Sequence, residues 1–184
     1  MIFASVYPAS DILEMAKEVG VEIELIPIAY DAQVFFTNSA NSIEGLTTEQ
    51  ISNIYVNNAY ANWKELGGPD ATLLPYCRNN DSGSHAQMER HFLNGKEIHA
   101  DIRVENTSLT MSSIITEVID AGQDDPPAYA LGYSIYYYYR NMMDFMIGPD
   151  ADGNYALKLL VIDGVYPTDE TIADGSYPLS NNTY

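Results

Sequence analysis

The chain has 184 residues, of which 46% are hydrophobic and 18% are charged, so it can bury a core and is not expected to be disordered. Its 8 Lys and Arg stand against 26 Asp and Glu, a formal net charge of -18, which counts against nucleic acids and anionic membrane surfaces as partners. The single cysteine, Cys77, excludes an intrachain disulfide and a cysteine-rich metal site.

The N-terminal part of the chain predicts one helix followed by two strands. Ser10 can cap a helix whose apolar residues recur from Ile12 to Val19, and Gly20 ends it. Apolar and acidic residues alternate over 21–25, and residues 34–36 form a short apolar run. Both patterns are typical of strands.

A clear helix start follows at residues 47–50, whose sequence Thr-Thr-Glu-Gln is a capping box. Leu46 and Ile51 are spaced to form a hydrophobic staple across it. The pair Asn57-Asn58 ends this helix, and residues 62–66 predict a short turn that Gly67-Gly68 closes. The buried face of the helix is expected to contain Ile51, Ile54 and Tyr55.

The most informative segment is Arg78-Asn79-Asn80-Asp81-Ser82-Gly83-Ser84, which joins a strand-like run to a helix. A helix start presents N–H groups without intrahelical partners and the positive end of the helix dipole, so it can hold an oxyanion. Gly83 lets a ligand approach the backbone, and Ser82 and Ser84 add hydroxyl donors. Arg78 offers a planar fork for phosphate or carboxylate. By itself, such a segment is also typical of a simple cap and turn.

The rest of the chain continues the alternation of strands and helices. This alternation indicates an α/β sheet with helices on its faces. The expected elements are a helix over 88–92, a strand over 102–104, a helix over 111–118, a strand over 128–139, a strand over 157–162 and a short helix over 168–172.

Five short motifs follow one another along the chain: Leu46-Thr47 with Glu49-Gln50-Ile51, Asn62-Trp63-Lys64-Glu65-Leu66-Gly67-Gly68, Arg78 with Ser82-Gly83-Ser84, Leu131-Gly132-Tyr133, and Val161-Ile162-Asp163-Gly164-Val165 with Pro167-Thr168 and Tyr177-Pro178-Leu179. In this order they resemble the phosphate-binding substrate proteins of bacterial ABC transporters. The likeness covers nearly the whole chain.

The resemblance implies an α/β fold of the class II periplasmic-binding-protein type, with one complete three-layer lobe and an incomplete first lobe. Residues 1–30 would belong to lobe 1, residues 31–133 to lobe 2, and residues 134–184 to the return crossover and the remainder of lobe 1. The crossover strands would lie near residues 28–36 and 133–139. Ligand would be held between the lobes, which close on a hinge.

The resemblance also assigns roles to the residues of the informative segment. Arg78 corresponds to the family's phosphate-binding arginine. Ser82, Gly83 and Ser84 correspond to its Ser-Gly-Thr, and the serine that replaces threonine keeps the hydroxyl. Asn80 stands where the family often has an aspartate that interacts with the arginine, so Arg78 is expected to be held differently here.

The first lobe would contribute Ser5, at the end of a strand that reaches the cleft. The adjacent position carries an aspartate in well-known members, which accepts the proton of hydrogen phosphate, but it is Val6 here. Without that carboxylate the identity of the anion stays open, so phosphate or a related oxyanion is the expected ligand. No metal and no other cofactor is expected.

Relative to the family, the chain also begins after the glycine- and serine-rich loop that opens the first lobe. The sequence is therefore expected to be a fragment or a truncated product, with an export signal upstream. The resemblance implies an extracellular, surface-anchored or periplasmic protein that delivers its ligand to an ABC permease. An incomplete lobe would expose apolar surface, so self-association is expected.

Three other interpretations have some support in the sequence. Ser82, Ser84, His85 and Cys77 could suggest an enzyme, but no nucleophile elbow is present and no catalysis is expected. Residues 150–154 are similar to a calcium loop, but the glycine comes too early, so a turn at Asp152-Gly153 is preferred. A binding module for signalling or adhesion could use the tyrosines of residues 133–139, although packing in a strand explains them better.

Overall fold

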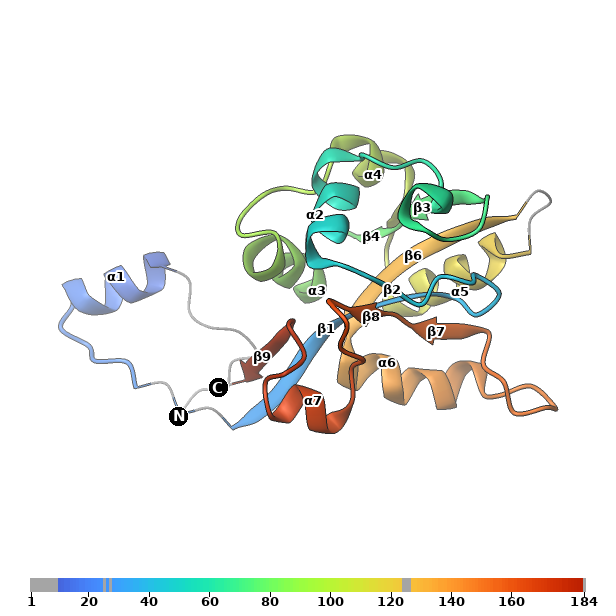
Figure 1. Ribbon diagram of the computed structural model, residues 1–184. Coiled ribbons are helices and arrows are strands. Elements are labelled where there is room, and N and C mark those ends of the chain that lie inside the picture. Colours follow the sequence, from blue (N-terminus) through green and yellow to red (C-terminus); the bar gives the residue numbers. More distant parts are fainter. Residues whose placement is uncertain (1–9, 25, 27, 124–126, 184) are drawn as a thin grey trace.

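A five-stranded mixed sheet runs through the middle of the molecule (Figure 1). The computed structural model describes residues 10–24, 26, 28–123 and 127–183. The strand order is β3 (Thr72–Pro75), β6 (Ala128–Ile135), β1 (Ala29–Asn38) and β7 (Leu157–Leu159), and β9 (Ser180–Thr183) pairs with the first half of β1. β1 is antiparallel to β6, β7 and β9, whereas β3 and β6 are parallel. The strand expected at residues 34–36 is thus confirmed.

The pairing of β1 with β6 fixes the centre of the sheet. Phe35 lies opposite Tyr133, and Phe36 lies opposite Gly132. A Cβ atom at Gly132 would lie 2.7 Å from the ring of Phe36, closer than packed carbon atoms approach. The glycine of the Leu131-Gly132-Tyr133 motif is therefore needed for close packing of the two strands.

Helices and two small sheets surround the central sheet (Figure 1). The helices are α2 (Thr48–Asn57), α3 (Gly83–Gln87), α4 (Ala100–Glu105), α5 (Met111–Ala121), α6 (Tyr136–Met142) and α7 (Asp169–Ala173), with a 3-10 turn at Trp63–Leu66 and π-helical turns at Met88–Phe92 and Met143–Ile147. The small sheets pair β2 (Gly45–Leu46) with β8 (Val161–Ile162) and β4 (Cys77–Arg78) with β5 (Thr107–Ser108). None of the described helices combines the length and apolar character needed to cross a lipid bilayer.

The predicted helix start at residues 47–50 is confirmed by the structure. The Thr47 hydroxyl accepts from the backbone N–H of Gln50, and the Gln50 side chain accepts from the backbone N–H of Thr47. Asn58 ends α2 in the left-handed conformation, with φ of 48°. The expected buried face is also confirmed, because Ile51, Ile54 and Tyr55 are at most 1% exposed.

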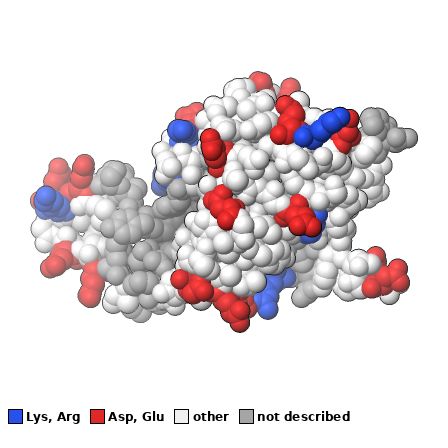
Figure 2. Space-filling view, viewed as in Figure 1, with Lys and Arg blue, Asp and Glu red and all other residues white. Residues whose placement is uncertain are grey.

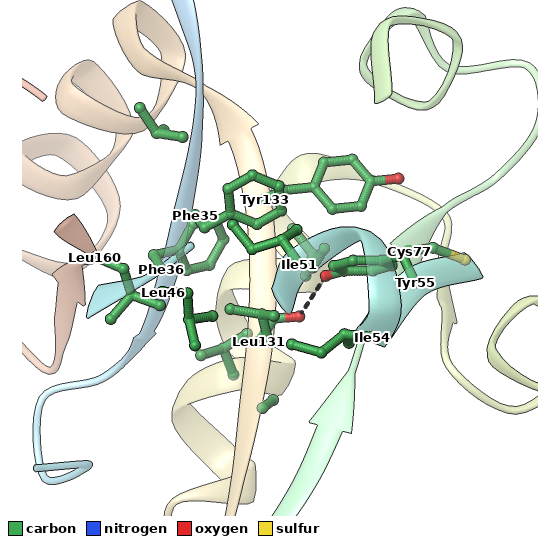
Figure 3. Close-up of a cluster of buried hydrophobic side chains, with 14 of the residues drawn as sticks. Phe35, Phe36, Leu46, Ile51, Ile54, Tyr55, Cys77, Leu131, Tyr133 and Leu160 are labelled. Atoms are coloured by element: carbon green, nitrogen blue, oxygen red, sulfur yellow. Dashed lines mark hydrogen bonds between the residues drawn. The ribbon is translucent and has the colours of Figure 1, made fainter. Parts of the chain in front are cut away.

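Buried aromatic residues join α2 and the 3-10 turn to the sheet. The Tyr55 hydroxyl lies 3.0 Å from the carbonyl oxygens of both Tyr76 and Leu131, and Figure 3 shows the bond to Leu131 within the cluster. The indole Nε1 of Trp63 donates to the carbonyl oxygen of Tyr129 at 2.7 Å. Each polar atom of these large apolar side chains therefore has a partner, which makes their burial favourable.

The strand predicted over residues 102–104 is wrong, because these residues belong to the helix α4. Ile102 is 2% exposed, whereas Val104 is 82% exposed. His99 caps the helix, and its Nδ1 accepts from the N–H of Asp101 at 3.3 Å. Two apolar residues cannot distinguish a strand from a helix, and here the cap and the neighbouring packing selected the helix.

The strand predicted over residues 128–139 is confirmed as β6 up to Ile135 and is wrong in its last four residues, where α6 begins at Tyr136. The carboxylate of Asp31 in β1 accepts from the N–H of Tyr137 at 3.2 Å and so bonds the start of α6. Tyr139 packs on Phe36, with ring centroids 5.1 Å apart. Tertiary contacts with β1 thus outweighed the strand preference of tyrosine.

The apolar run over residues 157–162 forms two short strands and not one. β7 ends at Leu159, and β8 begins at Val161. The backbone N–H of Leu160 donates to Phe35 and that of Val161 donates to Glu44. The chain therefore leaves the central sheet at Leu160 and joins the small sheet with β2. The short helix expected at 168–172 is confirmed as α7, with Thr168 as its N-cap.

The N-terminal helix α1 (Ser10–Glu18) forms as predicted but lies apart from the sheet (Figure 1). Its apolar residues Ile12 and Met15 are 48% and 60% exposed, and Val19, directly after it, is 69% exposed. The strand predicted over 21–25 is wrong for the described residues 21–24, which are exposed and unpaired. A strand needs a partner strand to be stable, and residues 21–24 pair with no strand among the described residues. Ser5 and Val6 lie outside the described residues.

Candidate functional site

The loop between β4 and α3 is attached to the core through its backbone. Cys77 is fully buried, and its N–H donates to the carbonyl oxygen of Asn106 at 2.9 Å. The next N–H, that of Arg78, donates to the Tyr133 hydroxyl at 3.0 Å. The N–H of Asn79 donates to the carbonyl oxygen of Ser108 at 3.2 Å. The base of the loop is therefore fixed by strands β5 and β6.

Tyr133 supports the loop from within the core. Its side chain is fully buried, and burial raises the pKa of its hydroxyl well above the usual value. The phenol therefore stays neutral and can accept the N–H of Arg78. Sequence reasoning did not find this role, because Tyr133 lies 55 positions from Arg78 along the chain.

The guanidinium of Arg78 makes one hydrogen bond among the described residues. Its Nη2 atom donates to the carbonyl oxygen of Leu109 at 3.3 Å. Its Nε atom is buried and has no partner among the described residues. An arginine has five N–H donors in one plane, so this half-buried side chain can still bind an anion by two parallel bonds.

The first turn of α3 places two serine hydroxyls and two backbone N–H groups together. Ser82 is the N-cap, and its Oγ accepts from the N–H of His85 at 3.1 Å. The Ser84 Oγ lies 3.5 Å from the Ser82 Oγ. Gly83 is exposed and has open space where a Cβ would stand. Because Gly83 and Ser84 precede the first intrahelical bond, their N–H groups can meet an approaching anion.

Asn80 lies exposed on the turn between Arg78 and Ser82. Within the described part of the chain its side chain makes no hydrogen bond with Arg78, whose guanidinium bonds the Leu109 carbonyl instead. The adjacent Asn79 has a buried Oδ1 without a described partner. Asn79 thus has a buried acceptor that no described residue bonds, whereas Asn80 is exposed to solvent.

His85 and Glu89 lie behind the start of α3. His85 is 3% exposed, and its Nε2 lies 3.3 Å from Glu89 Oε1. The same carboxylate oxygen accepts from the N–H of Ile98 at 3.0 Å. Among the described residues the imidazole bonds neither Ser82 nor Ser84, so no serine–histidine pair of the kind used by hydrolases is formed.

The remaining alternative residues have structural roles. Burial raises the pKa of the Cys77 thiol, which is the opposite of the change that activates a nucleophilic cysteine. The Asp150 carboxylate accepts from the N–H groups of Asp152 and Asn154 at 2.9 and 2.8 Å, which accounts for residues 150–154 as a turn. The described residues contain no group of three His, Cys, Asp or Glu that could hold a metal ion.

The comparisons with known proteins agree with one another. A family model described as "PBP superfamily domain" matches residues 4–184. The phosphate-binding protein PstS of Borreliella burgdorferi is 29% identical over 155 residues, which cover 84% of this chain and 50% of that protein. PstS of Bacillus subtilis is 26% identical over 173 residues, which cover 92% of this chain and 49% of that protein.

A solved structure extends this agreement to three dimensions. An ABC-type phosphate transport receptor from Vibrio cholerae superposes with a TM-score of 0.70 at 20% identity, covering 98% of this chain and 64% of the receptor. At this identity the likeness concerns the fold. The chain spans about half the length of the curated relatives it matches.

Proposed function

The chain belongs to the PBP superfamily, and on that premise we propose that it is the solute-binding component of an ABC importer and captures phosphate or a related oxyanion. This family and the mixed α/β fold are those that the sequence motifs indicated. One observation carries the proposal. The loop from Arg78 to Ser84 carries, within seven residues, a guanidinium, two hydroxyls that lie 3.5 Å apart and a helix start.

The magnitudes favour anion binding by this loop as one side of a larger site. Charge-assisted hydrogen bonds contribute about 1.5–3 kcal/mol each, and the loop can make several. Association costs ~4–15 kcal/mol in lost freedom, while micromolar affinity needs about 8 kcal/mol of surplus. The loop alone is therefore expected to bind in the millimolar range, and tight binding requires donors from a second lobe.

The overall charge does not contradict this ligand. Asp and Glu are scattered over the face seen in Figure 2, in keeping with the net charge of -18. Such a field weakens anion binding at long range, but salt screens it beyond about 8–10 Å. At contact distance the Arg78 guanidinium and the fixed N–H dipoles of α3 dominate.

The division into lobes is part of the same proposal. Residues 31–133 would form the lobe that carries the loop, and residues 1–30 and 134–184 would belong to the other lobe, which contributes Ser5. The greater length of the relatives supports a more complete first lobe in the protein that acts. That protein would work outside the cytoplasmic membrane and deliver its ligand to a permease without chemistry on it.

Titration calorimetry with inorganic phosphate tests the proposal. Two proteins are measured, the 184-residue chain and a gene product extended upstream. Each is compared with its own Arg78→Gln variant. The control is Arg90→Gln, which removes the same charge from an exposed residue of the π-helical turn. Loss of the Arg78 bonds is expected to weaken binding by about 10- to 100-fold, and the control by less than about twofold.

Three results would overturn parts of this proposal. Equal binding of phosphate by the Arg78→Gln and Arg90→Gln proteins would show that the loop is not part of the anion-binding site. Micromolar binding by residues 1–184 alone would show that a second set of donors is not required. Turnover of a phosphate compound by either protein would replace capture with catalysis.

A further inference from the structure

Strand β7 forms one edge of the central sheet, and its outer side is unpaired among the described residues. Ala156 and Leu160, on either side of β7, each make a backbone hydrogen bond with β1 or the residue after it. Residues of an antiparallel pair alternate between bonded and non-bonded positions, so Lys158 also bonds β1. The N–H and C=O groups of Leu157 and Leu159 therefore point away from β1, and no described residue bonds them.

A cavity of about 440 Å³ lies against this edge and is lined by all three residues of β7. Leu159 lies opposite Phe36 and shares its face of the sheet, on which Tyr139 of α6 packs. Leu157 is on the same face, because alternate residues of a strand point to the same side, and Lys158 is on the opposite face. An open edge beside a largely apolar cavity can accept a further strand.

Residues 21–24, with the sequence Val-Glu-Ile-Glu, have the pattern of a strand that is buried on one side. Val21 and Ile23 are 57% and 38% exposed and alternate with two glutamates. The segment pairs with no strand among the described residues. Its apolar side chains would lose contact with water if it joined a sheet, which is favourable.

The segment and the edge match in one antiparallel register. The three opposed pairs are Val21 with Leu159, Glu22 with Lys158 and Ile23 with Leu157. The outward groups of the two leucines then form about four backbone hydrogen bonds, and both apolar side chains lie on the side of α6. A register shifted by one residue would place a glutamate on that side instead.

The charges agree with this register as well. Glu22 would lie directly across from Lys158, and opposite charges at such positions attract. No described residue forms an ion pair with Lys158. Burial lowers the pKa of its ammonium, and the nearby Glu44 raises it. The ammonium is therefore available to a further carboxylate.

Within one copy of the chain the segment cannot reach this edge. Leu157 lies opposite Asn38 at the end of β1, and the chain enters β1 at Ala29. A strand from residue 29 to residue 38 covers about 30 Å, whereas the chain from Ile23 to Ala29 spans at most about 22 Å. Figure 1 accordingly shows α1 and β7 at opposite ends of the molecule.

We propose that a second copy of this chain supplies the strand, so that residues 21–24 of one copy pair with the free edge of β7 in the other. Each copy has one such segment and one such edge, so a symmetric dimer can form the contact twice. The expected self-association thereby gains a defined contact. The inference does not depend on the proposed anion site.

Sedimentation velocity of the 184-residue chain over a range of concentrations measures this association. Salt at about 0.15 M screens the repulsion between two acidic copies beyond about 8 Å. Glu22→Lys and Lys158→Glu each place like charges opposite each other and are expected to weaken association by about tenfold. The double variant restores the attraction and should recover most of the affinity. Glu18→Lys makes the same charge change at the end of α1 and should have less than about a twofold effect.

A cross-link tests the register directly. Glu22 and Lys158 would form a non-hydrogen-bonded pair, whose Cα atoms lie about 4.5 Å apart, within the reach of a disulfide. A Glu22→Cys protein mixed with a Lys158→Cys protein under mild oxidation should give a covalent heterodimer. Mixing Glu22→Cys with Lys64→Cys is the control, because Lys64 is 70% exposed and lies far from β7 in the sequence.

Two results would overturn this inference. One is a monomer at every concentration. The other is association that the charge variants leave unchanged, without a preferred cross-link between positions 22 and 158, since the contact would then lie elsewhere. Should Lys158→Glu not fold, Glu22→Lys and the cross-link decide, because residue 22 is exposed and outside the sheet. Phosphate capture stands or falls separately from either result.

Discussion

Helices α1 and α2 carry similar local signals but have different surroundings. Each has apolar residues at helical spacing, and the chain turns through a positive φ after each, at Gly20 and Asn58. Ile54 of α2 is 1% exposed, whereas Ile12 of α1 is 48% exposed. Spacing and stop signals therefore specify a helix, but a partner surface is needed to bury its apolar face.

The partner surface of α2 is the strand β6 beneath it. Tyr55 reaches the Leu131 carbonyl, and its ring packs edge-on against Tyr133 at 5.7 Å (Figure 3). The same Tyr133 holds the N–H of Arg78. Core packing under α2 and the position of the candidate anion loop are thus connected, whereas α1 has no comparable connection among the described residues.

The largest expected difference between the two helices is in how much stability the protein loses when an isoleucine is replaced by alanine. Ile54→Ala should lower the free energy of unfolding by about 2–5 kcal/mol, because it leaves a cavity in the core. Ile12→Ala should change it by less than about 0.5 kcal/mol. Urea unfolding at several protein concentrations measures both. A cost above about 1 kcal/mol for Ile12→Ala would show that α1 is buried in solution, for instance by self-association.

Removing the hydroxyl of Tyr133 tests the connection between the core and the anion loop. Tyr133→Phe should destabilise the protein by about 1–3 kcal/mol, because the buried N–H of Arg78 loses its acceptor. Amide hydrogen exchange at Arg78 should become faster. Tyr137→Phe is the control, since Tyr137 is 69% exposed. Equal effects of the two substitutions would mean that the bond to Arg78 has no role in stability.

The capping box of α2 gives a smaller effect. Thr47→Ala should cost about 1 kcal/mol, since it removes the acceptor of the Gln50 N–H. Thr47→Ser keeps the oxygen and should cost less than half as much. Thermal unfolding followed by circular dichroism compares the three proteins. An unchanged midpoint for Thr47→Ala would show that packing alone determines the start of this helix.

The smallest effect concerns two aspartates that interact with α6. Burial raises the pKa of Asp31, so its contribution to stability is present at low pH and is lost as the pH rises through its folded pKa. The bond from Arg140 lowers the pKa of Asp169, so its contribution is present above the unfolded pKa and is lost as the pH falls through the folded value. Carboxyl NMR titration should give midpoints on opposite sides of the usual aspartate value.

Arg140→Gln checks the cause of the second shift. The midpoint of Asp169 should return toward its usual value, and that of Asp31 should stay where it is. An unchanged Asp169 midpoint in this variant would show that the ion pair with Arg140 is not what lowers the pKa of Asp169.

Much of the local structure could be predicted where capping and spacing agree. The capping box at residues 47–50, the 3-10 turn at Trp63–Leu66 and the stripe of α5 are examples. Prediction was wrong where a distant residue determined the outcome. Asp31 bonds the start of α6 from another strand, and Leu160 bonds β1 where one continuous strand was expected. Such partners cannot be seen in a local window.

The candidate site shows the same limit. The donors Arg78, Ser82 and Ser84 could be named because arginine, serine and a helix start have recognisable chemistry. The supports of the loop could not be named, since Tyr133 and the Leu109 carbonyl come from other elements. Gln33, whose side-chain amide is buried without a partner among the described residues, has an ordinary place in a strand sequence.

The sequence by itself determined the family, the alternation of strands and helices, and the candidate donors between Arg78 and Ser84, because these depend on residue type and short spacing. The tertiary structure alone decided which apolar faces are buried, where Tyr136 turns from strand to helix, and which side chains lack a partner. These depend on contacts between residues far apart in the chain, whose free energies exceed the local preferences of the residues involved.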